Sequence, residues 1–143
     1  MDKAQIADLF MRGQDCAQVT IDNYTDKLPV DAETANRIMA CYGGGSGIGE
    51  TCGAVIGALA VIGLEYGHKG PDDMDARNEM MAKRAEFLNA WKEKRGSCMC
   101  SELLGYDVSK PEEFQIILDK GLMFDLCPEL VLDAVEILDK MID

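Results

Sequence analysis

A chain of 143 residues has the size of one domain, and its composition of 48% hydrophobic and 28% charged residues excludes a disordered or fibrous protein. Its formal net charge of -12 argues against binding to nucleic acids or anionic membranes, because both require a positive surface field. The first residues lack the basic and apolar succession of a signal peptide, so we expect a single domain over residues 1–143 in the cytoplasm. In that compartment, six cysteines indicate metal binding or redox chemistry more than structural disulfides.

Three short helices are predicted before the first run of glycines. Apolar residues recur at helical spacing over residues 4–11 and again over 15–24, which places Cys16 in the first turn of the second helix. Asp31 is a suitable N-cap for a third helix over 32–40, because its side chain can accept a hydrogen bond from a free backbone N–H group. The N-terminal part of the chain is therefore predicted to be helical, with short connections.

A glycine-rich loop over residues 43–49 precedes the most apolar segment of the chain. Residues 52–64 are nearly all apolar, and small side chains recur among them. This run is shorter than the roughly 20 residues that a bilayer span requires, so we predict a central buried helix that neighbouring backbones approach closely. The loop lacks the lysine of a phosphate-binding P-loop, and we expect its glycines to let the chain turn tightly before Cys52.

The C-terminal half is predicted to be helical as well. A long helix over 72–95 is followed by a short helical turn over 101–104 and a helix over 111–120. The last helix is expected to begin with Cys127 as its N-cap, because Pro128 suits the first helical position. The residues of the long helix expected to face the core are Met74, Met81, Ala85, Leu88 and Trp91. No alternating strand pattern is present, so the sequence predicts an all-α fold: a compact bundle of about seven helices around the central one.

Four of the six cysteines fall where a helix is predicted to begin: Cys16, Cys52, Cys100 and Cys127. The first turn of a helix carries free N–H groups and the positive end of the helix dipole, which stabilise a thiolate and lower the pKa of the thiol. If the bundle brings these helix starts to one end, the four thiolates could bind zinc or an iron–sulfur cluster. The paired C-x-x-C spacing is missing, however, and each cysteine alone could equally be a small buried hydrophobic residue.

The other two cysteines and the single histidine carry weaker signals. Cys98 and Cys100 flank one residue, a spacing at which one thiol could resolve an oxidised partner, although side chains two residues apart can also diverge. Cys41 is expected at the end of a helix, where a thiolate is disfavoured. His68 is expected in a turn. The chain has no C-x-x-C-H motif, and one histidine cannot supply two axial ligands, so haem is not supported.

Four short motifs follow one another along the chain: Gly13-x-x-Cys16-Ala17, Gly43-Gly44-Gly45 leading to Cys52-Gly53-Ala54-Val55-Ile56-Gly57, Cys100-Ser101-Glu102-Leu103-Leu104, and Cys127. In content and order they resemble the C_GCAxxG_C_C family of redox-active proteins, over almost the whole chain. The family label writes the central motif as GCAxxG, whereas this chain reads Cys-Gly-Ala at that point. The resemblance assigns the four family cysteines to the same four helix starts and leaves Cys41 and Cys98 outside the set.

The resemblance implies redox activity. A similar domain accompanies haem in split-Soret cytochromes, and the resemblance to that domain implies an iron–sulfur centre. The leading hypothesis is therefore that the four cysteines hold an iron–sulfur cluster and that the protein exchanges electrons with a basic redox partner. One alternative is a thiol–disulfide protein, with Cys52 and then Cys100 as the candidate low-pKa thiolate. Another is a structural zinc or interaction module without redox chemistry. These hypotheses differ in whether the protein is an enzyme.

Overall fold

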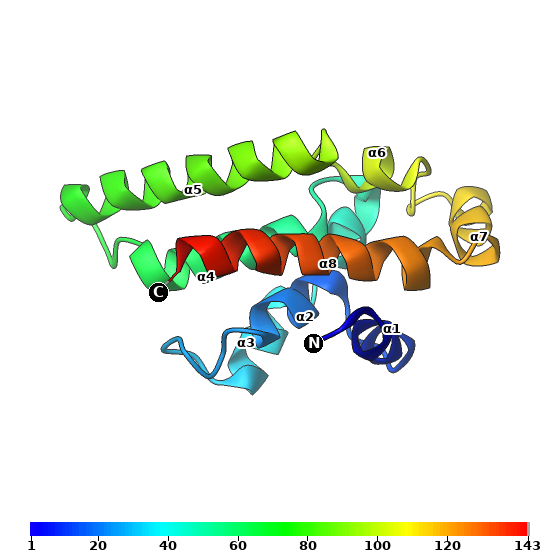
Figure 1. Ribbon diagram of the computed structural model, residues 1–143, viewed down its shortest axis with the longest axis horizontal. Helices are drawn as coiled ribbons and strands as arrows, with labels where there is room; N and C mark the ends of the chain where they lie inside the picture. Colours follow the sequence, from blue (N-terminus) through cyan, green and yellow to red (C-terminus); the bar gives the residue numbers. More distant parts are fainter. Residues whose placement is uncertain (143) are drawn as a thin grey trace.

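The structure is a computed structural model that describes residues 1–142. In chain order, its elements are α1 (Lys3–Met11), α2 (Cys16–Asp22), α3 (Ala32–Met39), the π-helical turn η1 (Gly45–Gly49), α4 (Gly53–Tyr66), α5 (Met74–Arg95), α6 (Cys100–Leu104), α7 (Pro111–Asp119) and α8 (Leu122–Met141). Figure 1 shows α5 along one side, α4 and α8 in the middle, and α1 to α3 along the other side. The predicted all-α fold is confirmed, with eight α-helices in the described part of the chain.

The central position of α4 follows from its lack of a polar face. This helix contacts α2, α5 and α8, and its side chains Val55 and Val61 are fully buried. Gly57 allows α2 to pack closely, because a Cβ atom at this position would lie 2.7 Å from the carbonyl oxygen of Ala17. The predicted buried helix with close backbone contacts is therefore confirmed.

Aspartate side chains fix the N-termini of the first three helices. Asp2, Asp15 and Asp31 each accept a hydrogen bond of 2.7 to 2.8 Å from the backbone N–H group three residues later. Such a cap stabilises a helix by about 1 kcal/mol. Because Asp15 holds the start of α2, Cys16 becomes the first residue of that helix.

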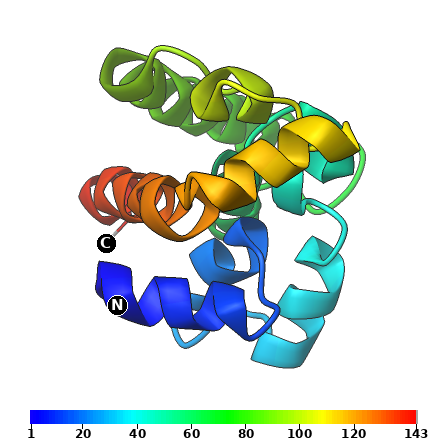
Figure 2. The same ribbon diagram turned by 90° about the vertical axis from the view of Figure 1, so that its right-hand side faces the viewer.

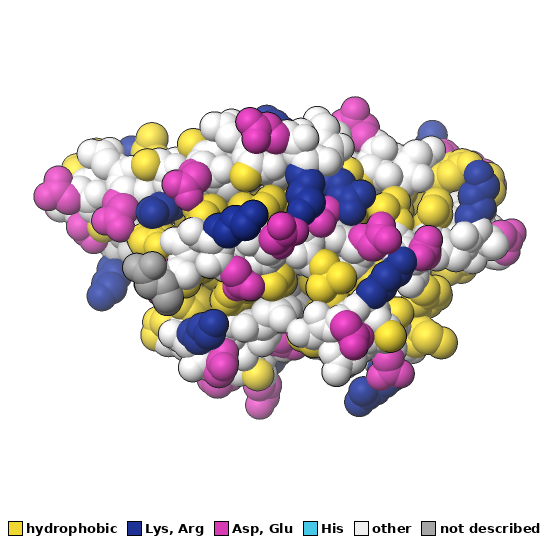
Figure 3. Space-filling view, viewed as in Figure 1, with side chains coloured by type: hydrophobic (Ala, Val, Ile, Leu, Met, Phe, Trp, Pro, Cys, Tyr) yellow, Lys and Arg dark blue, Asp and Glu magenta, His cyan; other side chains and the backbone are white. Residues whose placement is uncertain are grey.

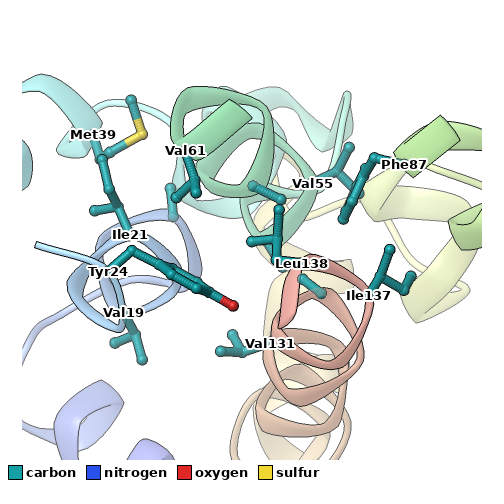
Figure 4. Packing of buried hydrophobic residues seen from close by; sticks show 14 of the residues in the cluster. Val19, Ile21, Tyr24, Met39, Val55, Val61, Phe87, Val131, Ile137 and Leu138 are labelled. Carbon is teal, nitrogen blue, oxygen red and sulfur yellow. The ribbon is translucent and has the colours of Figure 1, made fainter. Parts of the chain in front are cut away.

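The main hydrophobic core lies where α2, α4, α5 and α8 meet. Figure 4 shows Leu138 of α8 reaching toward α4, and the ring of Tyr24 reaching from the end of α2 toward α8. The Tyr24 hydroxyl donates a hydrogen bond of 2.8 Å to the Asp139 carboxylate, so its polar end is satisfied. Phe87 and Trp91 bring the largest fully buried side chains of α5 into this core.

The predicted inner face of α5 is wrong for most of its length. Met74 is 55% exposed and Met81 is 37% exposed, and Ala85 is exposed as well. The buried residues are Phe87, which the prediction missed, and Trp91, which it included. The helix carries apolar residues on two sides, and the residues on each side recur at helical spacing. Periodicity alone therefore could not show which side of α5 packs against the core.

The prediction that the last helix begins at Cys127 is also wrong. Helix α8 begins five residues earlier, after Gly121, whose positive φ of 69° turns the chain out of α7. Pro128 therefore lies inside the helix, where its missing N–H group removes one hydrogen bond to the preceding turn. Cys127 lies within the second turn of α8 and not at a helix N-terminus.

The surface carries acidic and basic side chains side by side, with hydrophobic atoms between them (Figure 3). Ion pairs of Arg95 with Asp133 and of Lys94 with Glu136 connect the end of α5 to α8. Figure 2 looks at the end of the molecule where α6, α7, η1 and the start of α8 gather. Within residues 1–142, none of the helices has the length and apolar character needed to cross a membrane.

Candidate functional site

All four cysteines predicted as site residues line one cavity, with a volume of about 140 Å³. They reach it from four different elements: Cys16 from α2, Cys52 from the residue before α4, Cys100 from α6 and Cys127 from α8. The remaining lining residues are Phe10, Gln14, Asp15, Gly43, Gly44, Gly53, Leu104, Val108, Ile117, Met123 and Leu130. The four predicted cysteines therefore face one shared cavity, in surroundings that are mostly apolar.

Cys16 and Cys52 are the two cavity thiols that influence each other most directly, because the Cys52 side chain lies within hydrogen-bonding reach of the Cys16 sulfur. The backbone N–H group of Gly44 also lies near the Cys16 sulfur and helps to lower the pKa of that thiol. Gly53 makes the approach of α2 possible, since a Cβ atom at this position would lie much closer to the Cys16 sulfur than van der Waals contact allows. The Cys-Gly order of the central motif thus has a steric reason.

Cys52 and Cys100 are fixed to each other by a single antiparallel β-bridge between Thr51 and Met99. The Cys52 N–H group donates to the carbonyl oxygen of Cys98 at 2.7 Å, and the Cys100 N–H group donates to that of Glu50 at 2.6 Å. Sequence reasoning missed this pairing, because one bridge is too short to leave an alternating pattern.

The turn before α6 is held in place by the core. Trp91 is fully buried, and its indole Nε1–H group donates a hydrogen bond of 2.8 Å to the carbonyl oxygen of Ser97. The Ser97 hydroxyl oxygen accepts a hydrogen bond from the Met99 N–H group at 3.0 Å and donates one to Glu102. The positions of Cys98 and Cys100 therefore depend on the packing of α5.

The glycine-rich loop packs directly against the cavity wall. Gly45 has a φ of 61°, and a Cβ atom at this position would lie 2.9 Å from the Cβ atom of Cys100 and 2.5 Å from the carbonyl oxygen of Glu50. A residue with a side chain would be strained by its conformation and would also meet the backbone. This finding agrees with the expectation that the glycines let the chain pass closely around the start of the central helix.

The thiol pKa values correct the simple argument from helix N-termini. The hydrogen bond from Cys52 lowers the pKa of Cys16, whereas the same contact and burial raise the pKa of Cys52 well above its usual value. Burial raises the pKa of Cys100 to about 12 and raises the pKa of Cys127 strongly. Within this pair the lowered pKa belongs to Cys16, whereas the sequence favours Cys52 and then Cys100 as the low-pKa thiolate.

The other candidate residues lie outside the cavity. Cys41 is exposed after the end of α3, and Cys98 is half-buried beside the β-bridge. His68 is exposed in the connection between α4 and α5.

Asp15 lines the cavity next to Cys16 and was not singled out from the sequence, because a helix N-cap is its ordinary role. Within residues 1–142, no three Cys, His, Asp or Glu side chains are placed to hold a metal ion.

The assignment of Cys16 as the thiolate predicts a specific alkylation profile. In a Cys41→Ser background, iodoacetamide should modify Cys16 from a lower pH than it modifies the other thiols, because the folded pKa of Cys16 lies below the usual thiol value. Cys52→Ala should move the midpoint of this profile to higher pH, since the hydrogen-bond donor is lost. The measurement is mass spectrometry of the tryptic peptide over residues 13–27, whose only cysteine is Cys16.

Cys52→Ser is the matched control for this profile, because its hydroxyl group keeps a hydrogen-bond donor beside the Cys16 sulfur. It should hold the midpoint closer to that of the parent protein than Cys52→Ala does. Equal midpoints in all three proteins would contradict the proposed origin of the low pKa.

One comparison with known proteins covers the part of the chain that contains the cavity cysteines. A protein-family model with the description "Putative redox-active protein (C_GCAxxG_C_C)" matches residues 14–141, which include all four cavity cysteines. No curated protein and no solved structure matches the chain significantly. Because the family match covers nearly the whole sequence, the chain belongs to the C_GCAxxG_C_C family.

Proposed function

We propose that Cys16, Cys52, Cys100 and Cys127 hold an iron–sulfur cluster and that the protein transfers electrons. The observation that supports this proposal is the convergence of four thiols, from four separate elements, on one cavity of about 140 Å³. Iron–sulfur clusters are held by cysteine thiolates, commonly four. When bound, such a cluster would supply one-electron chemistry.

The residues around the cavity fit this group. The four thiols are the only cysteine or histidine side chains that line the cavity. Most of the other lining side chains are apolar, which limits the access of water. The Gly44 N–H group lies near the Cys16 sulfur, and a hydrogen bond to a ligand sulfur raises the reduction potential of a cluster.

The partner is proposed to be a basic redox protein. The chain has a formal net charge of -12, and opposite charges on two proteins accelerate their association. Salt screens this attraction, so binding should weaken as ionic strength rises. The proposed location of this exchange is the cytoplasm.

The test is anaerobic purification followed by a visible absorption spectrum and iron, sulfide and zinc analysis of one sample. The protein should show broad visible absorption with iron and acid-labile sulfide. Serine at any one of the four cavity cysteines should reduce the iron content on the order of tenfold or more, because a ligand is lost. Cys41→Ser is the matched control and should retain the parent content, since its side chain is exposed outside the cavity.

A second function is favoured by the contact between Cys16 and Cys52. A thiolate hydrogen-bonded to a neutral thiol is the arrangement that precedes thiol–disulfide exchange: the Cys16 thiolate attacks a disulfide substrate, and Cys52 then attacks the Cys16 sulfur to release the second product thiol. A colourless protein that stays free of iron after reconstitution, and that forms a Cys16–Cys52 disulfide, would support this function and contradict the cluster.

A further inference from the structure

Cys98 lies directly opposite Cys52 in the register of the β-bridge. Thr51 and Met99 form the bridge pair, and the Cys52 N–H group donates to the Cys98 carbonyl oxygen at 2.7 Å. In an antiparallel pairing, the residue after Thr51 faces the residue before Met99. The side chains of two residues that face each other in this way lie on the same face of the pairing.

This register brings Cys98 within disulfide range of Cys52. One backbone hydrogen bond, from the Cys52 N–H group to the Cys98 carbonyl oxygen, joins the two residues. Directly opposed residues of an antiparallel pairing have Cα atoms about 4.5 to 5.5 Å apart, inside the range of about 4.4 to 6.8 Å found in disulfides. Their Cβ atoms are about 4.5 to 5.5 Å apart, close to the disulfide spacing of about 3.5 to 4.5 Å. Cys98 and Cys100 are less suitable, because residues two apart on an extended segment have Cβ atoms about 6.5 Å apart.

The two thiols also differ in access. Cys98 is half-buried and lies outside the cavity, whereas Cys52 is only 4% exposed and lines it. A small disulfide in solution can therefore reach Cys98 before it reaches Cys52. Cys98 also packs against the hydrophobic core cluster of which Cys52 is a member.

We infer that Cys98 and Cys52 form a reversible disulfide that withdraws Cys52 from the cavity. The Cys98 thiolate attacks oxidised glutathione and displaces one glutathione thiolate; the Cys52 thiolate then attacks the Cys98 sulfur and displaces the second. In total, two protein thiols lose two protons and two electrons, and one glutathione disulfide becomes two glutathione molecules.

Formation of this disulfide requires no cofactor. Its consequence for the cavity, the loss of one of four ligands, rests on the proposed function. Cys98 would then make the site sensitive to redox conditions. Oxidation removes Cys52 from the set of four ligands, and a reducing thiol returns it. To form this disulfide, the two Cβ atoms have to move closer together than in the register of the bridge. The resulting strain raises the reduction potential of the disulfide, so a reducing thiol is expected to break it.

The experiment uses the full chain in a Cys41→Ser background, freed of metal by chelation and then equilibrated with oxidised glutathione. Met99 separates the two neighbouring thiols, so cyanogen bromide cleavage gives Cys52 in the fragment 40–74, Cys98 in 82–99 and Cys100 in 100–123. We expect a linked pair of the fragments 40–74 and 82–99, the loss of two free thiols, and recovery of both with dithiothreitol.

Two variants complete the test. Cys98→Ser should abolish this link, and with circular dichroism unchanged it should still bind as much iron as the parent protein. Cys100→Ser should keep the link. Linkage of Cys52 to Cys16, linkage of Cys98 to Cys100, or an unlinked Cys98 would each overturn the inference. Failure of the proposed function would look different, because the parent protein would then contain no iron whatever the fragment map shows.

Discussion

Replacing Trp91 with alanine is expected to lower the free energy of unfolding by about 3 to 5 kcal/mol, the usual cost of removing a fully buried aromatic side chain. The side chain packs against Phe87 with a ring centroid distance of 6.3 Å, so its loss leaves a cavity beside another large residue. Denaturant unfolding followed by circular dichroism measures the effect. Because α5 also anchors the turn that precedes α6, the same variant should lose the order of that turn.

Trp91→Phe separates the two roles of the side chain. It keeps most of the buried area but removes the Nε1–H donor to the Ser97 carbonyl oxygen, which costs about 1 to 3 kcal/mol when the acceptor is left unsatisfied. Alkylation of Cys98 should become faster in this variant, because the turn that carries it loosens. Met81→Ala on the same helix is the control: its side chain is 37% exposed, and its effect should stay within about 0.5 kcal/mol. A Trp91→Ala protein as stable as this control would contradict the role assigned to Trp91.

Gly53→Ala should damage the cavity more than any other single added methyl group on α4. The new Cβ atom would overlap the Cys16 sulfur and would also lie 3.1 Å from the Tyr42 carbonyl oxygen. Overpacking of this kind typically costs about 1 to 3 kcal/mol. The displaced Cys16 would lose its hydrogen bond with Cys52, so its alkylation midpoint should rise, and the iron content should fall with it.

Gly63→Ala is the matched control for this prediction. Gly63 lies on the same helix, and a Cβ atom there would have no neighbour within 4 Å. Alanine is the better helix former, so this variant should be up to about 1 kcal/mol more stable than the parent protein. Equal alkylation profiles of Cys16 in the two variants would show that Gly53 is not a steric requirement of the site.

Local signals in the sequence predicted the elements well where the deciding contact is itself local. Asp31 is the N-cap expected from its position before an amphipathic segment, and α3 begins where that cap places it. The central helix could be predicted because residues 52–64 have no polar face to expose. The four cavity cysteines were identified from their positions and from the family motifs, and the structure brings them together.

Predictions failed where a competing long-range interaction decides the outcome. Pro128 suggested a helix start, but the preceding residues gain more by continuing the helix from Gly121, so Cys127 lies inside α8. Helix position also suggested low thiol pKa values, yet burial raises the pKa of Cys100 and that of Cys127, an effect that depends on neighbours distant in sequence. The β-bridge between Thr51 and Met99, which sets Cys52 opposite Cys98, is likewise a tertiary contact with no local pattern.

The distribution of the cavity thiols along the chain has a consequence for folding. They extend from Cys16 in α2 to Cys127 in α8, so a group bound to all four would close three long loops of the polypeptide at once. While the group stays bound, the closed loops lower the conformational entropy of the unfolded chain. If the group binds only the native state, its binding free energy adds to the free energy of unfolding. Occupancy of this one cavity would therefore stabilise helices at both ends of the sequence, and release of its occupant would loosen them together.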